Sequence, residues 1–176
     1  MRVKKITELK RLSVEEYKET DKLPLVVILD NVRSLNNVGA IFRSSDAFRV
    51  SAIYLCGITA IPPHADIHKT ALGAEDSVPW RYFENTLDAV ENLRERDFTI
   101  CAVEQTFDSI LLSDFECKPS TRYAIIVGNE VKGVEQKVVD QCQCAIEIPQ
   151  EGTKHSLNVS VATGVVLWEF FKQLNA

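Results

Sequence analysis

The sequence predicts an α/β fold, a mostly parallel sheet with helices on both faces. Residues 25–30 and 123–130 contain continuous apolar runs rich in β-branched side chains, which are typical of strands buried on both faces. Segments with helical periodicity lie between such runs, so strand and helix alternate along the chain. The runs are too far apart to be joined as hairpins, and we therefore expect the strands to pair in parallel.

The segment before the first strand is predicted to hold a short helix. Ser13 and Glu16 fit a capping box, so residues 13–20 are expected to be helical. We divide the chain into an N-terminal arm, residues 1–22, and one domain, residues 23–176. The arm is basic, and a weak contact with a phosphate backbone is as good an interpretation as a solvated terminal segment.

The helix after the first strand is defined by an apolar stripe at helical spacing. The stripe consists of Val38, Ile41, Phe42, Ser45 and Phe48. Asn36 or Asn37 is expected to cap this helix, because asparagine is a favoured N-cap residue. Arg43 lies off the stripe, where its guanidinium would suit a phosphate or a carboxylate. An ion pair between Arg43 and Asp46 is an equally good interpretation.

The rest of the chain continues the alternation. Further strands are predicted at residues 52–57, 98–105 and 144–149. Further helices are predicted at residues 86–97, 134–142 and 156–174. Residues 58–78 are predicted to form a long loop with one helical turn near residues 68–72. The last helix is apolar nearly all round, which predicts that it is largely buried.

Composition limits the class of protein. The chain has 176 residues, of which 45% are hydrophobic, enough for one domain with a full core. The sequence shows neither a signal peptide nor a membrane-spanning run, so we expect a cytoplasmic protein. The five cysteines are interpreted as reduced thiols, because no set of four metal ligands surrounds the pair Cys142 and Cys144. The net charge of −5 argues against an extended nucleic-acid footprint.

Ligands of parallel α/β folds bind outside the carboxyl ends of the strands. The loops expected there follow Asp30, Gly57, Gln105, Gly128 and Pro149. The loop after the first strand is rich in amides and carries an arginine, Arg33. The loop at residues 128–134 begins with a glycine, which allows a backbone to approach a ligand closely. It lacks the glycine patterns of dinucleotide-binding and phosphate-binding loops.

The loop before the last helix places two polar residues at its start. Ser156 and Asn158 either cap this helix or contact a ligand. Asn158 would lie two residues inside the predicted helix, where asparagine is a poor helix former, and this favours a ligand contact. Together the polar loops predict a site for a nucleotide-like ligand and an anionic partner.

Three of these stretches together resemble the SpoU/TrmH branch of the SPOUT methyltransferases. The matching segments are "NNVGAIFRSSDAF", "IIVGNEVKGV" and "IPQEGTKHSLNVSVATGVVLWE". Gly128 lies 20 residues before Ile148, and Ile148 lies 9 residues before Leu157, as in typical members. Enzymes of this branch transfer a methyl group from S-adenosylmethionine to a ribose 2′-hydroxyl in tRNA or rRNA.

The resemblance implies a C-terminal trefoil knot, which pattern arguments alone would not propose, and a homodimer whose active sites are completed across the interface. It assigns the reacting centre to Asn37, Arg43, Glu130, Ser156 and Asn158. It assigns the cofactor pocket to Gly128, Asn129, Ile148 and Leu157. Contacts with RNA are expected from Arg33, Arg43 and Lys69.

The mechanism that follows depends on positioning, because a ribose hydroxyl is a weak nucleophile. In the family, the arginine that corresponds to Arg43 is proposed to remove the hydroxyl proton, yet a guanidinium stays protonated in proteins. We favour a role in which Arg43 binds the adjacent phosphate and the developing alkoxide, while the phosphate or a water takes the proton.

Other interpretations are also considered. His64 and His68 have the spacing of zinc ligands on one helix face, but no further ligand is near, so we interpret them as loop histidines and predict no metal. A catalytically silent RNA-binding dimer would not need the polar set above. A small-molecule enzyme with another nucleotide cofactor would need a glycine pattern that is missing. tRNA is favoured over rRNA, since the short chain is similar to the minimal tRNA enzymes, and neither DNA nor a membrane is expected as a partner.

Overall fold

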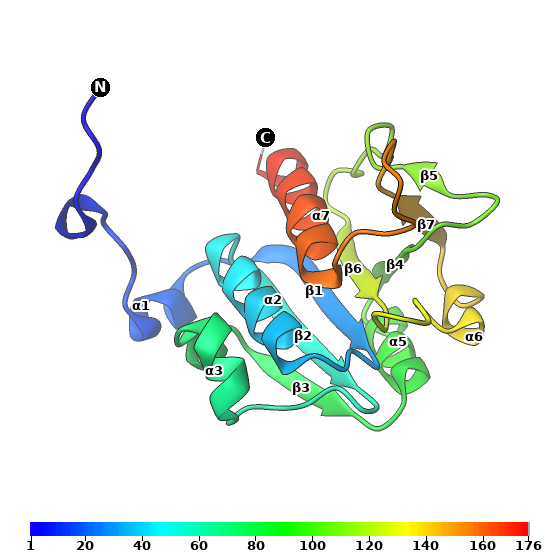
Figure 1. Ribbon diagram of the computed structural model, residues 1–176, viewed down its shortest axis with the longest axis horizontal. Coiled ribbons are helices and arrows are strands. Elements are labelled where there is room, and N and C mark those ends of the chain that lie inside the picture. The colour runs from blue at the N-terminus through cyan, green and yellow to red at the C-terminus, as the bar shows by residue number, and fades with distance from the viewer. Residues whose placement is uncertain (176) are drawn as a thin grey trace.

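The computed structural model describes residues 1–175 and shows a seven-stranded sheet in which all strand pairs are parallel. The strand order is β3-β2-β1-β6-β4-β7-β5 (Figure 1). The strands are β1 (Leu23–Asp30), β2 (Val50–Cys56), β3 (Trp80–Phe83), β4 (Phe98–Val103), β5 (Ile110–Leu111), β6 (Arg122–Val127) and β7 (Cys144–Glu147). The predicted parallel α/β class is confirmed.

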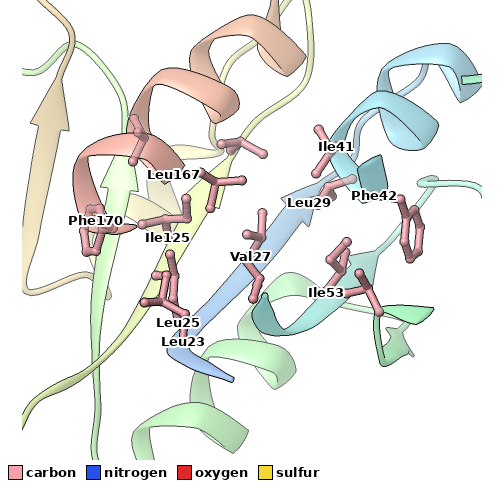
Figure 2. Close-up of a cluster of buried hydrophobic side chains, with 14 of the residues drawn as sticks. Leu23, Leu25, Val27, Leu29, Ile41, Phe42, Ile53, Ile125, Leu167 and Phe170 are labelled. Carbon is pink, nitrogen blue, oxygen red and sulfur yellow. The ribbon is translucent and has the colours of Figure 1, made fainter. Parts of the chain in front are cut away.

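Helices cover both faces of the sheet. They are α1 (Val14–Glu19), α2 (Leu35–Ala47), α3 (Ala65–Ala71), α4 (Ala74–Ser77), α5 (Thr86–Arg94), α6 (Gln136–Val139) and α7 (Val159–Leu174), preceded by a 3₁₀ turn at Ile6–Glu8. Alternate side chains of β1 divide between two cores, because neighbouring strand residues point to opposite faces. Leu25 and Val27 join α2 and α7 on one face (Figure 2), whereas Val26 and Ile28 pack with α5 and α6 on the other.

The N-cap of helix α2 lies two residues before Asn36 and three before Asn37, the two predicted caps. This cap is Ser34, whose extended backbone lets the hydroxyl accept the backbone N–H of Asn37 at 3.3 Å. The prediction of Asn36 or Asn37 as the cap is therefore wrong. The predicted stripe is confirmed, since Val38, Ile41, Phe42 and Ser45 are all buried.

The segment from residue 58 to residue 83 is more ordered than the sequence indicated. Helix α3 overlaps the helical turn predicted near residues 68–72, whereas helix α4 and the edge strand β3 were not predicted. Gly39 lets α2 approach α3, because a Cβ there would lie 2.2 Å from the carbonyl oxygen of Ile67. Short edge elements carry few periodic residues, so the sequence pattern cannot reveal them.

Helix α7 differs from its prediction in length and burial. It starts at Val159, and its N-cap is Asn158, so Asn158 does not lie inside the helix. Its inner face is buried in the core, yet Val161, Val165 and Trp168 are 53%, 39% and 51% exposed. The prediction of a largely buried helix is wrong, because α7 packs on a single face of the sheet and its outer face stays uncovered by the described chain (Figure 1).

The N-terminal arm carries the predicted capping box. Ser13 Oγ accepts the backbone N–H of Glu16 at 3.1 Å, and the Glu16 carboxylate accepts the backbone N–H of Ser13 at 2.7 Å. Tyr17 of α1 is buried in the core, and the chain before α1 extends away from the sheet (Figure 1). None of the helices within residues 1–175 has the length and apolar character that a membrane crossing requires. All five cysteines are free thiols.

Candidate active site at the carboxyl ends of the strands

A pocket of about 410 Å³ lies where β4, β6 and β7 end. Its walls come from the residues after β4, the loop after β6, the loop after β7 and the first turn of α7. The apolar part of the wall includes Val103, Val127, Ile146, Ile148, Leu157 and Val159. Three of the five loops predicted to surround a ligand therefore meet at one pocket, whose volume falls within the usual range for small-molecule sites.

The loop after β6 folds back on itself into a compact turn. The backbone groups of Asn129 and Gly133 exchange hydrogen bonds of 3.0 and 2.9 Å. The Asn129 side chain accepts the backbone N–H groups of Val131 and Lys132 and donates to a carbonyl at the end of β1. A Cβ on Gly128 would lie 2.1 Å from the carbonyl carbon of Gly133. Gly128 is thus required by its own loop, and because it also lines the pocket, the close approach of a ligand stays a prediction.

Glu130 joins this loop to the start of α2. Its carboxylate accepts the backbone N–H groups of Arg33 and Ser34 and the side-chain amide of Asn37, each at 2.9 Å. Burial acts to raise the pKa of Glu130, but these donors outweigh it, so the pKa lies below its usual 4.5. The carboxylate is therefore held in its charged form beside the pocket.

Asn158 extends this set of contacts to α7. Its side-chain amide donates to the Asn37 side-chain oxygen at 3.2 Å, while its own oxygen accepts the backbone N–H groups of Ser160 and Val161. Glu130, Asn37 and Asn158 thus form a continuous hydrogen-bonded chain, which we call the polar relay. Residues from three distant stretches of sequence meet in it. The relay borders the pocket, because Glu130 lies on the pocket wall.

The other predicted site residues divide into two groups. Ser156 lines the pocket together with the predicted cofactor residues Gly128, Asn129, Ile148 and Leu157. Arg43 lies on the exposed side of α2, and within residues 1–175 its guanidinium forms neither the ion pair with Asp46 nor any other hydrogen bond or ion pair. Lys69 is paired with Asp66 on α3 and does not line the pocket.

The two histidines have roles within α3. The His64 ring accepts the backbone N–H of Asp66 as the N-cap of the helix. The His68 ring contacts the Glu75 carboxylate at 2.5 Å. Both side chains therefore have protein partners of their own.

Two residues outside the predicted site, Asn31 and Glu104, also hold it together. Asn31 has a left-handed backbone, with φ of 56°, and its side chain contacts Asp30, Glu135 and the backbone N–H of Ile58. Glu104 accepts the backbone N–H groups of Gln105 and Val134 at 2.9 and 3.0 Å and lines the pocket. Each residue directly follows a buried strand, and this position in the sequence is what could have identified it as a site residue.

The fold and the pocket together define an α/β protein with a nucleotide-sized site at the carboxyl edge of a parallel sheet. The sequence matches the SpoU rRNA Methylase family over residues 24–168. The chain belongs to this family, and its class is that of the RNA 2′-O-methyltransferases that use S-adenosylmethionine.

Individual relatives agree with this membership. A 23S rRNA (guanosine-2′-O-)-methyltransferase, RlmB, from Vibrio parahaemolyticus is 32% identical over 174 residues, covering 98% of this chain and 68% of the relative. The protein of that name from Escherichia coli K12 is 34% identical over 150 residues, covering 85% of this chain and 60% of the relative. The chain thus spans about two thirds or less of the length of these curated relatives.

Solved structures share the fold. The AdoMet-bound rRNA methyltransferase from Sinorhizobium meliloti superposes with a TM-score of 0.79 at 28% identity, covering 88% of this chain and 61% of that chain. The TrmH/SpoU tRNA modifying enzyme of A. aeolicus superposes with a TM-score of 0.79 at 28% identity, covering 91% of this chain and 81% of that chain.

Proposed function

We propose that this protein methylates a ribose 2′-hydroxyl in RNA with S-adenosylmethionine as the methyl donor. The observation that carries the proposal is the polar relay of Glu130, Asn37 and Asn158, which adjoins the pocket. A catalytically silent RNA-binding protein would have no use for a charged carboxylate held by three donors at this place. The family membership of the chain supports the same reaction.

The pocket residues fit the cofactor. Apolar side chains such as Ile148 and Leu157 offer a surface for an adenine ring, and backbone groups of the loop after β6 offer polar contacts at its edge. S-adenosylmethionine supplies an electrophilic methyl group on a positively charged sulfur. The Glu130 carboxylate attracts that positive charge, because it stays ionised at neutral pH. The attraction is lost once the methyl group has been transferred, which favours product release.

The reacting hydroxyl must be held in line with the methyl group, and its proton must leave. Arg43 is exposed on α2, so its guanidinium is free to bind the phosphate next to the target ribose. In this position it stabilises the developing alkoxide, and the proton passes to the phosphate or to a water molecule. Asn37 and Asn158 orient the ribose, and Ser156 completes the wall of the pocket beside it. Arg33 and Lys69 add contacts to the RNA backbone.

We propose ribosomal RNA as the substrate class. The curated relatives that share 32–34% of their residues with this chain are named as 23S rRNA enzymes. tRNA, which the sequence analysis favoured, is the named substrate class of the A. aeolicus neighbour at 28% identity. Either RNA is met in the cytoplasm, the compartment in which we place the protein.

We also propose that the enzyme is a homodimer. The exposed apolar stripe of Val161, Val165 and Trp168 on α7 is the surface that a second copy would cover. The loop containing Ser156 precedes this helix, so a partner bound at α7 would lie close to the pocket. The trefoil knot implied by the resemblance remains our prediction for the segment that leads into α7.

The test of the reaction is transfer of a labelled methyl group from S-adenosylmethionine to purified ribosomal RNA and to purified tRNA. We expect a 2′-O-methylated nucleoside by mass spectrometry from ribosomal RNA, and none with Glu130→Gln. Labelling of tRNA alone would replace ribosomal RNA as the substrate. Binding of S-adenosylmethionine without transfer to either RNA would favour the silent RNA-binding alternative, and failure to bind would revive a different cofactor.

A further inference from the structure

Glu104 occupies a fixed position on the pocket wall, directly after β4. Its two carboxylate oxygens are held separately, one by the backbone N–H of Gln105 at 2.9 Å and the other by the backbone N–H of Val134 at 3.0 Å. Val134 is 6% exposed, so one of the anchoring groups is itself buried. The carboxylate therefore has a defined orientation and does not move freely in solvent.

The loop after β6 is shaped around this carboxylate. Gly133 has a left-handed backbone, with φ of 68°, and a Cβ at this position would lie 2.3 Å from an oxygen of Glu104. Each carboxylate oxygen can accept two hydrogen bonds, and within residues 1–175 each oxygen of Glu104 accepts one. Two acceptor positions thus remain for a ligand that brings two donors.

We propose that Glu104 binds the ribose 2′- and 3′-hydroxyls of the methyl donor, an inference that rests on the proposed function. The ribose diol of a nucleoside presents two adjacent donors, and an acidic residue after a strand binds the diol in other parallel α/β folds. Both Glu104 and Glu130 line the pocket, and they are held by different contacts. Glu130 is bonded to Asn37, on the side that the proposed function gives to the methyl group. Glu104 is bonded to the backbone N–H of Val134, directly after the turn, which leaves it for the ribose.

The proposal distinguishes Glu104 from a residue that only supports the loop. Removal of a purely supporting carboxylate would weaken every nucleoside ligand equally. If the carboxylate instead contacts the diol, removing a hydroxyl from the ligand weakens binding only while the carboxylate is present. Such dependence is measured by combining a change in the protein with a change in the ligand.

The experiment is calorimetric binding of S-adenosylhomocysteine and of its 2′-deoxy analogue to the native protein and to Glu104→Gln. We expect Glu104→Gln to weaken S-adenosylhomocysteine about tenfold, since a hydrogen bond to a charged group is lost. We expect the 2′-deoxy change to weaken binding to the native protein but to have little further effect in the variant. Glu147→Gln is the matched control, because that carboxylate also lies on the pocket wall but accepts the Ser109 hydroxyl at 2.7 Å. In Glu147→Gln, the 2′-deoxy change should weaken binding as much as it does in the native protein.

Three results would overturn the inference. If the 2′-deoxy change weakened binding to Glu104→Gln as much as binding to the native protein, Glu104 would only support the loop. Unchanged affinity would remove it from the site. A loss seen with S-adenosylhomocysteine but not with 5′-methylthioadenosine, which keeps the ribose and lacks the amino acid, would assign Glu104 to the ammonium group. If the native protein bound none of these ligands, the proposed function itself would fail, so the two failures are distinguishable.

Discussion

At the scale of single residues, Arg43 differs from the polar relay beside it. Glu130, Asn37 and Asn158 are bonded to one another, whereas Arg43 is exposed and within residues 1–175 its side chain has no bonded partner. A side chain without protein partners contributes little to the structure of the pocket, but it is available to bind RNA. In the proposed function, the site thus combines a pre-formed, hydrogen-bonded part with an arginine that the RNA substrate would engage.

We predict that Arg43→Ala lowers the rate of methyl transfer by on the order of 10²–10³, the usual cost of removing a group that stabilises a developing oxyanion. The affinity for S-adenosylhomocysteine should change little, because Arg43 does not line the pocket. Arg43→Lys should recover part of the activity, since it keeps the charge but not the planar fork. Calorimetry that showed lost cofactor affinity in Arg43→Ala would contradict this role.

Glu130 leads to a prediction about pH. Its pKa in the folded protein lies below the usual 4.5, so the unfolded chain binds the proton more readily than the folded one. The stabilisation that results is complete above the usual pKa and is lost as the pH falls through the lower, folded value. The difference in unfolding free energy between native protein and Glu130→Gln should therefore shrink as the pH is lowered from about 7 to below 4.5. Urea titrations at several pH values measure it, and a difference that grew in acid would refute the assignment.

At the scale of elements, Asn158 serves two structures at once. Its side-chain oxygen caps α7, and its amide nitrogen donates to Asn37. Asparagine is favoured at this place for the cap alone, so the sequence could not show that the same side chain belongs to the polar relay. The two roles can be separated, because they use different atoms.

We predict that Asn158→Asp keeps the stability of the protein and loses activity. The aspartate oxygen still caps the helix, but it cannot donate to Asn37 and it places a second negative charge near Glu130. Asn158→Ala should lose activity and also about 1 kcal/mol of stability, the usual worth of an N-cap. Urea unfolding and the methyl-transfer assay measure the two effects. Full activity in Asn158→Asp would show that the bond from Asn158 to Asn37 is not needed for methyl transfer.

Some elements could be predicted from the sequence because burial leaves a long periodic signal. The strands β1 and β6 are apolar except for Asp30 at the end of β1 and Arg122 at the start of β6, and the stripe of α2 repeats over several turns. The short elements β3, β5 and α4 leave no such signal, since their form depends on neighbours in space. The exposed face of α7 was missed for a related reason. An apolar residue has the same letter in a core and in an interface, and periodicity cannot distinguish them.

At the scale of the whole molecule, the parallel topology explains why the site could be predicted in outline. Strands that run the same way end at one edge, so the polar loops after β1, β6 and β7 had to meet there. The topology does not determine which polar atoms bond to each other. Glu130 binds two backbone N–H groups more than 90 residues away, at Arg33 and Ser34. Backbone donors are present at every residue, so the sequence gives no sign of which ones are used.

Assembly also concerns the whole molecule, because the outer face of α7 is uncovered in the isolated chain. Val161, Val165 and Trp168 are spaced so that they share one side of the helix, and each is more than a third exposed. We predict that the native protein sediments with about twice the mass of the 19.8 kDa chain. Val165→Lys should shift it toward the monomer, since a charge would be buried in an apolar interface.

Leu111→Lys provides the matched control for this prediction. Leu111 is 41% exposed and Val165 is 39% exposed, but Leu111 lies on the edge strand β5 and not on α7. The control should keep the mass of the native protein, because β5 is not part of the proposed interface. Loss of methyl transfer in step with dissociation of Val165→Lys would show that the partner contributes to the site. A native protein that sediments as a monomer at micromolar concentration would remove α7 as the dimer surface.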